Sequence, residues 1–157
     1  MRHSDQPIEG SAPADESAPV DELTPAEGRY LCGVLYRSLQ EGPPVSNREL
    51  TDYLGVSGAS VTGMSKALAD AGLLTHERYH GVELTARGDR LARRLLFGRC
   101  VVEACFADRF GIGLLEEQAG RIATELDATQ IDTLSDCADL PCVSHCEATT
   151  PADCDRL

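Results

Sequence analysis

Cysteine is the residue type with the clearest capacity for chemistry in this 157-residue chain, which contains seven of them. Four are concentrated within eighteen residues near the C-terminal end: Cys137, Cys142, Cys146 and Cys154. The surrounding segment contains prolines and lacks apolar periodicity, so it cannot build a hydrophobic core of its own. Four thiolates are a complete ligand set for Zn(II) or for an iron–sulfur cluster. We therefore predict that these cysteines bind a metal ion or a cluster; a redox disulfide switch and an inert tail are the alternatives.

The expected cellular location favours the same chemistry. No apolar stretch approaches the ~18 residues that a membrane-spanning helix needs, and the first thirty residues lack the features of a signal peptide. We expect a cytoplasmic protein with no membrane partner, in which thiols stay reduced. The sequence contains no serine-histidine-aspartate set, glycine-rich phosphate loop or paired carboxylates in a defined context. We therefore expect that the protein is not an enzyme.

The net charge of -12 is concentrated in the two ends of the chain. Residues 1–23 carry six acidic residues against one arginine, and residues 111–157 carry ten against two. Residues 24–110 are nearly balanced, with eleven basic residues against ten acidic ones, so a nucleic-acid partner is not excluded. Thirteen arginines against one lysine, with an acidic surface, resemble the composition of proteins from a salt-rich, halophilic cytoplasm.

Between the acidic ends, the sequence predicts a set of helices with clear start signals. Residues 1–23 have too few bulky apolar residues to fold and are predicted to be a disordered acidic tail. Thr24, followed by proline and by Glu27, predicts the start of a helix that runs to about residue 40. Ser46 and Glu49 form a second capping pattern, which predicts a short helix ending at a glycine. These two helices are expected to support the helix that follows.

The helix predicted from about residue 58 carries the side chains best suited to reading DNA. Its inner stripe, Val61, Met64 and Leu68, has the spacing of a buried face. Its outer face and cap are small and polar: Ser57, Ala59, Ser60, Thr62 and Lys66. Hydroxyls can donate to or accept from base edges, and a lysine further along positions the helix on a phosphate. We predict DNA recognition by this face; the alternative is an amphipathic helix whose outer face is only solvated.

Residues 73–85 predict two short strands around a turn at His80 and Gly81, the pattern of a wing. Arg78 and His80 lie at its tip and are predicted to contact DNA phosphates. A long helix from Thr85 to about residue 110 follows, and its apolar stripe predicts a dimerisation seam. Two shorter helices are expected after it, at about 114–126 and from 128. A twofold dimer places two recognition helices about one DNA turn apart and therefore reads a palindromic operator in double-stranded DNA.

The stretch from about Ala26 to Leu134 resembles the iron- and manganese-dependent repressors of the DtxR/MntR type. The resemblance depends on VSGASVTGMSKALADAGLL in the predicted recognition helix, ERYHGVELTARG in the wing and ARRLL in the long helix. It implies a winged-helix DNA-binding domain, a helical dimerisation domain and metal-gated binding to promoters.

This sequence lacks most of the metal ligands that the resemblance implies. Arg99 falls where the family has a ligating histidine, although Glu103 falls at the position of the family's glutamate. Gly120, Ala123 and Thr124 fall at the positions of a second ligand helix, and none of them can bind a metal. A manganese or iron site of the family type therefore cannot be assembled from these residues.

Three further cysteines lie close to the missing ligands in this correspondence: Cys32, Cys100 and Cys105. Cys100 directly follows Arg99, whose guanidinium is expected to favour a thiolate. Two interpretations are open. The three cysteines form a second thiol sensor, or they are small buried side chains that fill the space left by a metal.

Together these expectations describe a mainly α-helical protein, a winged helix-turn-helix DNA-binding domain followed by an α-helical dimerisation domain. The expected divisions are the acidic tail 1–23, the winged domain 24–86, the dimerisation domain 87–135 and a cysteine-rich tail 136–157. The predicted function is a dimeric, sequence-specific transcriptional repressor that responds through cysteines to a metal ion, an iron–sulfur cluster or redox state. The alternatives are a repressor controlled by its abundance alone and a metal-binding protein-interaction module.

Overall fold

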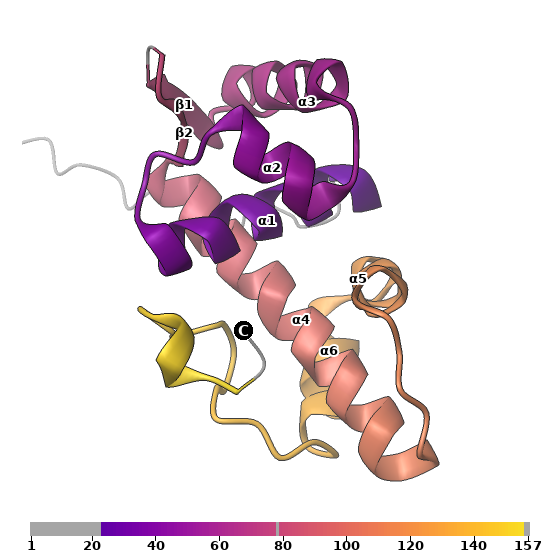
Figure 1. Cartoon of the computed structure of the whole chain (residues 1–157). Helices are drawn as coiled ribbons and strands as arrows, with labels where there is room; N and C mark the ends of the chain where they lie inside the picture. The colour runs from indigo at the N-terminus through magenta and orange to yellow at the C-terminus, as the bar shows by residue number, and fades with distance from the viewer. Residues whose placement is uncertain (1–22, 78, 156–157) are drawn as a thin grey trace, which may run out of the picture.

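The computed structural model describes residues 23–77 and 79–155. The predicted disordered tail, apart from its last residue, and Arg78 at the tip of the predicted wing lie outside the described residues. The described part is mainly helical, with one small antiparallel sheet, as predicted (Figure 1). Among the described helices, none is both long and apolar enough to cross a membrane.

The first two helices begin and end where the local signals predict. Helix α1 spans Pro25–Glu41, and Thr24 and Glu27 form the predicted capping box at its start. Helix α2 spans Asn47–Leu54 and begins with the second box, between Ser46 and Glu49. It ends at Gly55, which has a left-handed backbone conformation that favours glycine. These caps satisfy backbone N–H groups that a helix start otherwise leaves without partners.

The helix-turn-helix is completed by α3 and is followed by the wing. Helix α3 spans Gly58–Asp70, with the Ser57 hydroxyl accepting a hydrogen bond from the backbone at its start. Strands β1 (Leu74–Glu77) and β2 (Gly81–Leu84) pair antiparallel. An isolated bridge between Val45 and Val82 fixes the sheet to the segment before α2. Gly81 is required at that bridge, because an added Cβ would lie 2.0 Å from the Val45 carbonyl oxygen.

The long helix α4, Ala86–Phe110, connects the wing to the C-terminal half. Thr85 caps it as predicted, and the left-handed Gly111 ends it. Two short helices, α5 (Glu116–Glu125) and α6 (Ala128–Ser135), then pack against α4. The rest of the chain, which includes a single 3-10 turn at Pro151–Asp153, returns along α4 beyond these helices (Figure 1). Helix α4 therefore contacts α1 and β2 on one side and α5 and α6 on the other.

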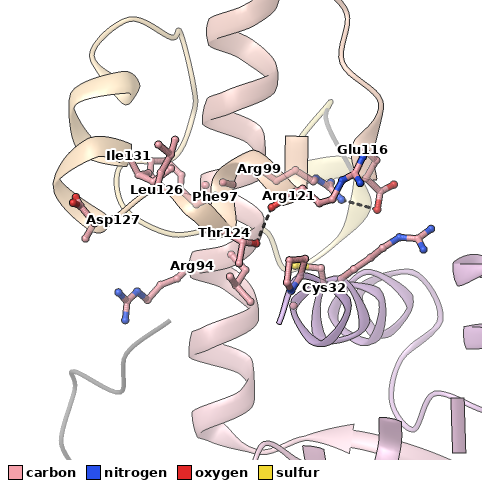
Figure 2. Close-up of a pocket in the computed structure, with 18 of the residues that line it drawn as sticks. Cys32, Arg94, Phe97, Arg99, Glu116, Arg121, Thr124, Leu126, Asp127 and Ile131 are labelled. Atoms are coloured by element: carbon pink, nitrogen blue, oxygen red, sulfur yellow. Dashed lines mark hydrogen bonds and ion pairs between the residues drawn. The ribbon is translucent and has the colours of Figure 1, made fainter. Parts of the chain in front are cut away.

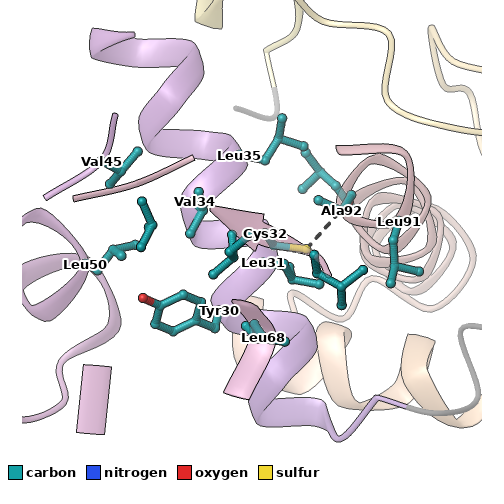
Figure 3. Packing of buried hydrophobic residues seen from close by; sticks show 14 of the residues in the cluster. Tyr30, Leu31, Cys32, Val34, Leu35, Val45, Leu50, Leu68, Leu91 and Ala92 are labelled. Atoms are coloured by element: carbon teal, nitrogen blue, oxygen red, sulfur yellow. Dashed lines mark hydrogen bonds between the residues drawn. The ribbon is translucent and has the colours of Figure 1, made fainter. Parts of the chain in front are cut away.

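The hydrophobic core lies where α1 packs against α2, α3 and the start of α4 (Figure 3). Leu31, Val34 and Leu35 of α1 are buried against Leu50 of α2 and Leu68 of α3. Burial of this apolar surface is the main term that holds the short elements together, since each helix alone is marginal in water. The core thereby sets the angle at which α3 is presented.

Candidate DNA-binding surface and thiol sites

Helix α3 presents the predicted recognition residues to solvent. All five are exposed: Ser57, Ala59, Ser60, Thr62 and Lys66. Val61 and Leu68 are fully buried beneath them and Met64 is half-buried, so the predicted inner stripe faces the core. The outer face combines exposed hydroxyls with glycine and alanine, which permits close approach to a groove.

A buried polar contact that the sequence analysis did not predict fixes the rotation of α3. Ser65 lies on its inner face and is fully buried, and its hydroxyl hydrogen-bonds to the hydroxyl of Tyr30 in α1. Burial raises the pKa of Tyr30, and the hydrogen bond to Ser65 partly offsets this. The available signal in the sequence was a serine four residues after Val61, on the side of the helix predicted to be apolar.

The exposed hydroxyl groups of α3 are partly engaged with the protein itself. The Thr62 hydroxyl donates to the carbonyl of Gly58 at 3.0 Å and accepts from the side-chain amide of Asn47 at 3.2 Å. The hydroxyls of Ser57 and Ser60 lie 2.9 Å apart. Asn47 belongs to α2, so it adds a polar side chain beside the predicted recognition surface. Its position could not be inferred from spacing within α3 alone.

Two residues at the wing tip were predicted to contact phosphates, and one of them, His80, lies within the described residues. His80 is exposed there, and its backbone N–H donates to the carbonyl of Glu77 at 3.0 Å. Its neighbour Tyr79 is 89% exposed and has a φ of 66°, an unusual backbone conformation for a side chain of this size. The tip therefore offers an aromatic ring to a partner as well as an imidazole.

A cavity of about 640 Å³ lies between α1, α4, α5 and α6 (Figure 2). The buried guanidinium of Arg99 lines it and forms ion pairs with Glu116 at 3.0 Å and Glu103 at 3.5 Å. Glu116 also accepts a hydrogen bond of 2.7 Å from the Tyr53 hydroxyl of α2. The Arg99–Glu116 pair thus ties α4 to α5, and Tyr53 extends this connection to the helix-turn-helix.

The guanidinium of Arg99 stays positively charged in this site. Burial by itself disfavours the charged guanidinium of Arg99, but the carboxylate of Glu116 and other nearby groups raise its pKa above the ordinary value. Burial and the hydrogen bond to Glu116 raise the pKa of Tyr53, so its phenol stays protonated. The positive charge of Arg99 therefore lies beside the carboxylates of Glu103 and Glu116, where the family type of site would hold Mn(II) or Fe(II). Gly120, Ala123 and Thr124 line the same cavity and offer no strong metal ligand, so these residues do not fit a manganese or iron site of O and N ligands.

All seven cysteines lie within the described residues and carry free thiols. Cys32 is buried in α1, and its thiol donates to the carbonyl of Ala92 at 3.8 Å (Figure 3). Burial raises its pKa to about 12, and burial raises the pKa of Cys100 to about 11. Arg99 lowers both pKa values, but it does not overcome burial. Arg99 therefore acts on Cys100 in the expected direction, but burial outweighs it and keeps the pKa of this thiol above its ordinary value.

The structure groups the cysteines differently from the two sets predicted from the sequence. Cys137 lies beside Cys105 of α4, since the two interact through charge and a side-chain hydrogen bond. The other three tail cysteines, at 142, 146 and 154, line a small cavity together with Cys100 of α4. Within residues 23–77 and 79–155, no three cysteine, histidine or acidic side chains lie close enough together to hold a single metal ion. Cys32 and Cys105 do not line that small cavity.

The core, the exposed α3 and the adjoining hairpin define a winged helix-turn-helix fold. Residues 22–82 match the family described as iron dependent repressor, N-terminal DNA binding domain. This part of the chain is therefore similar to the iron-dependent repressor family, whose members are metal-dependent transcriptional regulators. The resemblance stated from the sequence is confirmed.

Individual relatives agree with this assignment. The HTH-type transcriptional regulator MntR of Shouchella clausii (strain KSM-K16) is 31% identical over 69 residues, which cover 44% of this chain and 48% of that protein. The chain thus spans about half the length of this curated relative.

Solved structures show the same fold. The manganese regulator SloR superposes with a TM-score of 0.63 at 22% identity, and the metal-dependent transcriptional regulator MtsR with 0.64 at 23%. IdeR of T. acidophilum gives 0.63 at 22% identity. Each comparison covers 73% of this chain and 54% of the other chain. At these identities the comparisons establish the fold and leave the sensing chemistry to this chain's own residues.

Proposed function

We propose that this protein is a dimeric transcriptional repressor that binds a palindromic operator in double-stranded DNA and is controlled through its cysteines. The observation that carries the proposal is the exposed, small and polar face of α3, held at a fixed rotation on a repressor-type winged-helix scaffold. Ser57, Ala59, Ser60 and Thr62 are assigned to the groove. Lys66, His80 and Arg78 are assigned to phosphates, the last of them from its place in the sequence only.

Dimerisation is assigned to the far end of α4. The stripe expected to form the seam is partly used within the chain, because Leu91 and Val102 are buried in the monomer. Phe110 and Leu115, by contrast, are 66% and 70% exposed at the junction of α4 and α5, with the exposed Ile112 between them. A cluster of large apolar side chains next to a helical scaffold is typical of a protein interface. A twofold contact there would pair two copies of α3 for a symmetric operator.

The control mechanism follows from the position of α4. This helix starts immediately after the wing and carries Cys100 and Cys105 in its second half. A ligand or oxidant that acts on the thiols therefore acts on the element that positions the winged domain relative to the dimer contact. By linkage, a thiol state that favours one spacing of the two α3 helices changes the DNA affinity. The family's manganese or iron chemistry is not assigned to this chain, because the cavity holds Arg99 instead.

Acidic substitutions in α3 test DNA recognition. Fragments bound by the parent protein are first selected from genomic DNA of the source organism and footprinted. The double variant Ser60→Glu, Thr62→Glu should bind DNA with an affinity lower by a factor on the order of 100. Two groove contacts are lost, and the new carboxylates face the phosphates. The control pair Thr129→Glu and Thr133→Glu adds the same charge on an exposed part of α6 and should change the affinity little. Failure of the parent protein to enrich any fragment would overturn the proposal and favour a protein-interaction module.

The same footprint tests control by thiols. It should change between reduced protein, oxidised protein and protein treated with a chelator. A footprint that is identical in all three states would indicate a repressor regulated only by its abundance.

A further inference from the structure

Four cysteines from two distant parts of the sequence line one small cavity of about 20 Å³. They are Cys100 of α4 and three tail residues, Cys142, Cys146 and Cys154. The remaining lining residues are apolar: Phe97, Leu140 and Pro141. Cys146 is buried, and the other three thiols are half-buried. Four soft ligands therefore converge on a space shielded by apolar side chains.

Specific polar contacts hold the tail in this place. The backbone N–H of Cys146 donates to the carbonyl of Arg93 at 3.0 Å. The Arg93 guanidinium in turn donates to the carbonyls of Cys146 at 3.0 Å and Ala148 at 2.7 Å, and is itself oriented by Asp89 at 2.9 Å. Arg93 and Cys100 are seven residues apart, so they lie on one face of α4, two turns from each other. The tail is thus fixed along the face of the helix that carries the fourth thiol.

Cys137, the fourth cysteine of the tail, does not line this cavity. It interacts with Cys105 of α4 instead.

We propose that Cys100, Cys142, Cys146 and Cys154 ligate one iron–sulfur cluster. A single Zn(II) ion draws four sulfurs to ~2.3 Å, which leaves no space for a water-sized body at their centre. Here the four thiols surround an open cavity, and among the described residues no three such side chains approach closely enough for one ion. A cluster contributes its own sulfide and so spans a wider set of four cysteines. Its apolar surroundings also match the environment that shields such clusters from solvent.

Loading of the site is a ligand exchange without change of oxidation state. A preformed cluster held by four small thiolates enters, and an iron–sulfur bond forms to each cysteine as the bond to one small thiolate breaks. Each cysteine proton passes to the departing thiolate, which leaves as a thiol. This inference deepens the proposed control by thiols and depends on the proposed function only for its regulatory meaning.

The test is anaerobic exchange of a thiolate-supported iron–sulfur cluster into the full chain, followed by iron and acid-labile sulfide analysis and an absorption spectrum. The parent protein and Cys137→Ser should take up iron and sulfide in equal amounts with a visible charge-transfer band. Cys100→Ser and Cys154→Ser should retain less than about a tenth of this iron. Cys154 belongs to the tail and not to α4, so its substitution reports on the cluster without changing a residue of that helix.

Two outcomes would overturn the assignment. Loss of the cluster in Cys137→Ser with retention in Cys100→Ser would return the site to the four tail cysteines. Uptake of one zinc ion in preference to iron and sulfide by the parent protein would exclude a cluster. Circular dichroism of each variant verifies that it is folded, and all of these measurements are made without DNA. Failure of the site is therefore distinguishable from failure of DNA binding.

Discussion

At the scale of single residues, the position of α3 depends on one buried hydrogen bond. Ser65 and Tyr30 are both removed from water, and their hydroxyls satisfy each other. A buried hydroxyl without a partner costs free energy, whereas removal of both partners is nearly neutral. The pair therefore selects one rotation of α3 more than it adds net stability.

A double-mutant cycle should reveal this asymmetry. Ser65→Ala leaves the Tyr30 hydroxyl buried without its partner and should lower the free energy of unfolding by about 1–3 kcal/mol. Adding Tyr30→Phe should recover most of that loss. The measurement is denaturant unfolding of the parent, both single variants and the double variant. Equal and additive losses in the two single variants would show that the hydroxyls are not coupled.

Arg99 illustrates how one residue can change the chemistry of a cavity. The guanidinium of Arg99, which is part of the chain, is buried between α4 and α5 and forms ion pairs with the half-buried Glu103 and the exposed Glu116. Charge balance in this cavity therefore does not require a metal ion. The connection through Tyr53 carries the same arrangement to α2.

At the scale of elements, α4 depends on a close approach to the wing. Gly88 lies in its first turn, and an added Cβ would be 2.0 Å from the Leu73 carbonyl oxygen. No rotamer change can relieve this contact, because the opposing atom belongs to the backbone. Gly120, in the middle of α5, has open space around the same position.

These two glycines should respond oppositely to alanine. Gly88→Ala should lower the free energy of unfolding by about 2 kcal/mol or more, since α4 or the wing must shift. Gly120→Ala should raise it by up to ~1 kcal/mol, because alanine favours the helix. Thermal or denaturant unfolding of both variants measures the difference. A stabilised Gly88→Ala would mean that α4 packs less closely on the segment before β1 than described.

At the scale of the whole molecule, the proposed function requires two copies of the winged domain in a fixed relation. Each α3 alone covers a short site, whereas a dimer reads two half-sites about one DNA turn apart. The excess of carboxylates in the two ends of the chain disfavours contact with phosphates, so we expect DNA binding to depend on the nearly neutral middle, residues 24–110.

Charge introduced into the exposed apolar cluster should separate the dimer. Phe110→Asp with Leu115→Asp places two carboxylates in the proposed interface and should convert the dimer to monomers in sedimentation experiments. Val143→Asp is the control for an added surface charge, because Val143 is 80% exposed and lies in the tail, outside the segment 110–115. DNA affinity should fall with dissociation of the dimer and stay unchanged in the control. A parent protein that is already monomeric on DNA would contradict the arrangement.

Local signals in the sequence determined most of the secondary structure. Thr24, Ser46, Ser57 and Thr85 each cap the helix they were expected to cap, and Gly111 ends α4. Capping depends on a hydroxyl and a few neighbouring backbone groups, so it can be inferred from adjacent residues. The exposed side of α3 followed from its spacing in the same way.

Only the tertiary structure decided which distant groups meet. It placed Cys100 with three tail cysteines and Cys137 with Cys105, although the tail's own spacing suggested a set of four. It also buried Leu91 and Val102 within the chain and joined Arg99 to Glu116. The physical reason is that such contacts depend on how elements pack across long stretches of chain, which periodicity within one element does not encode.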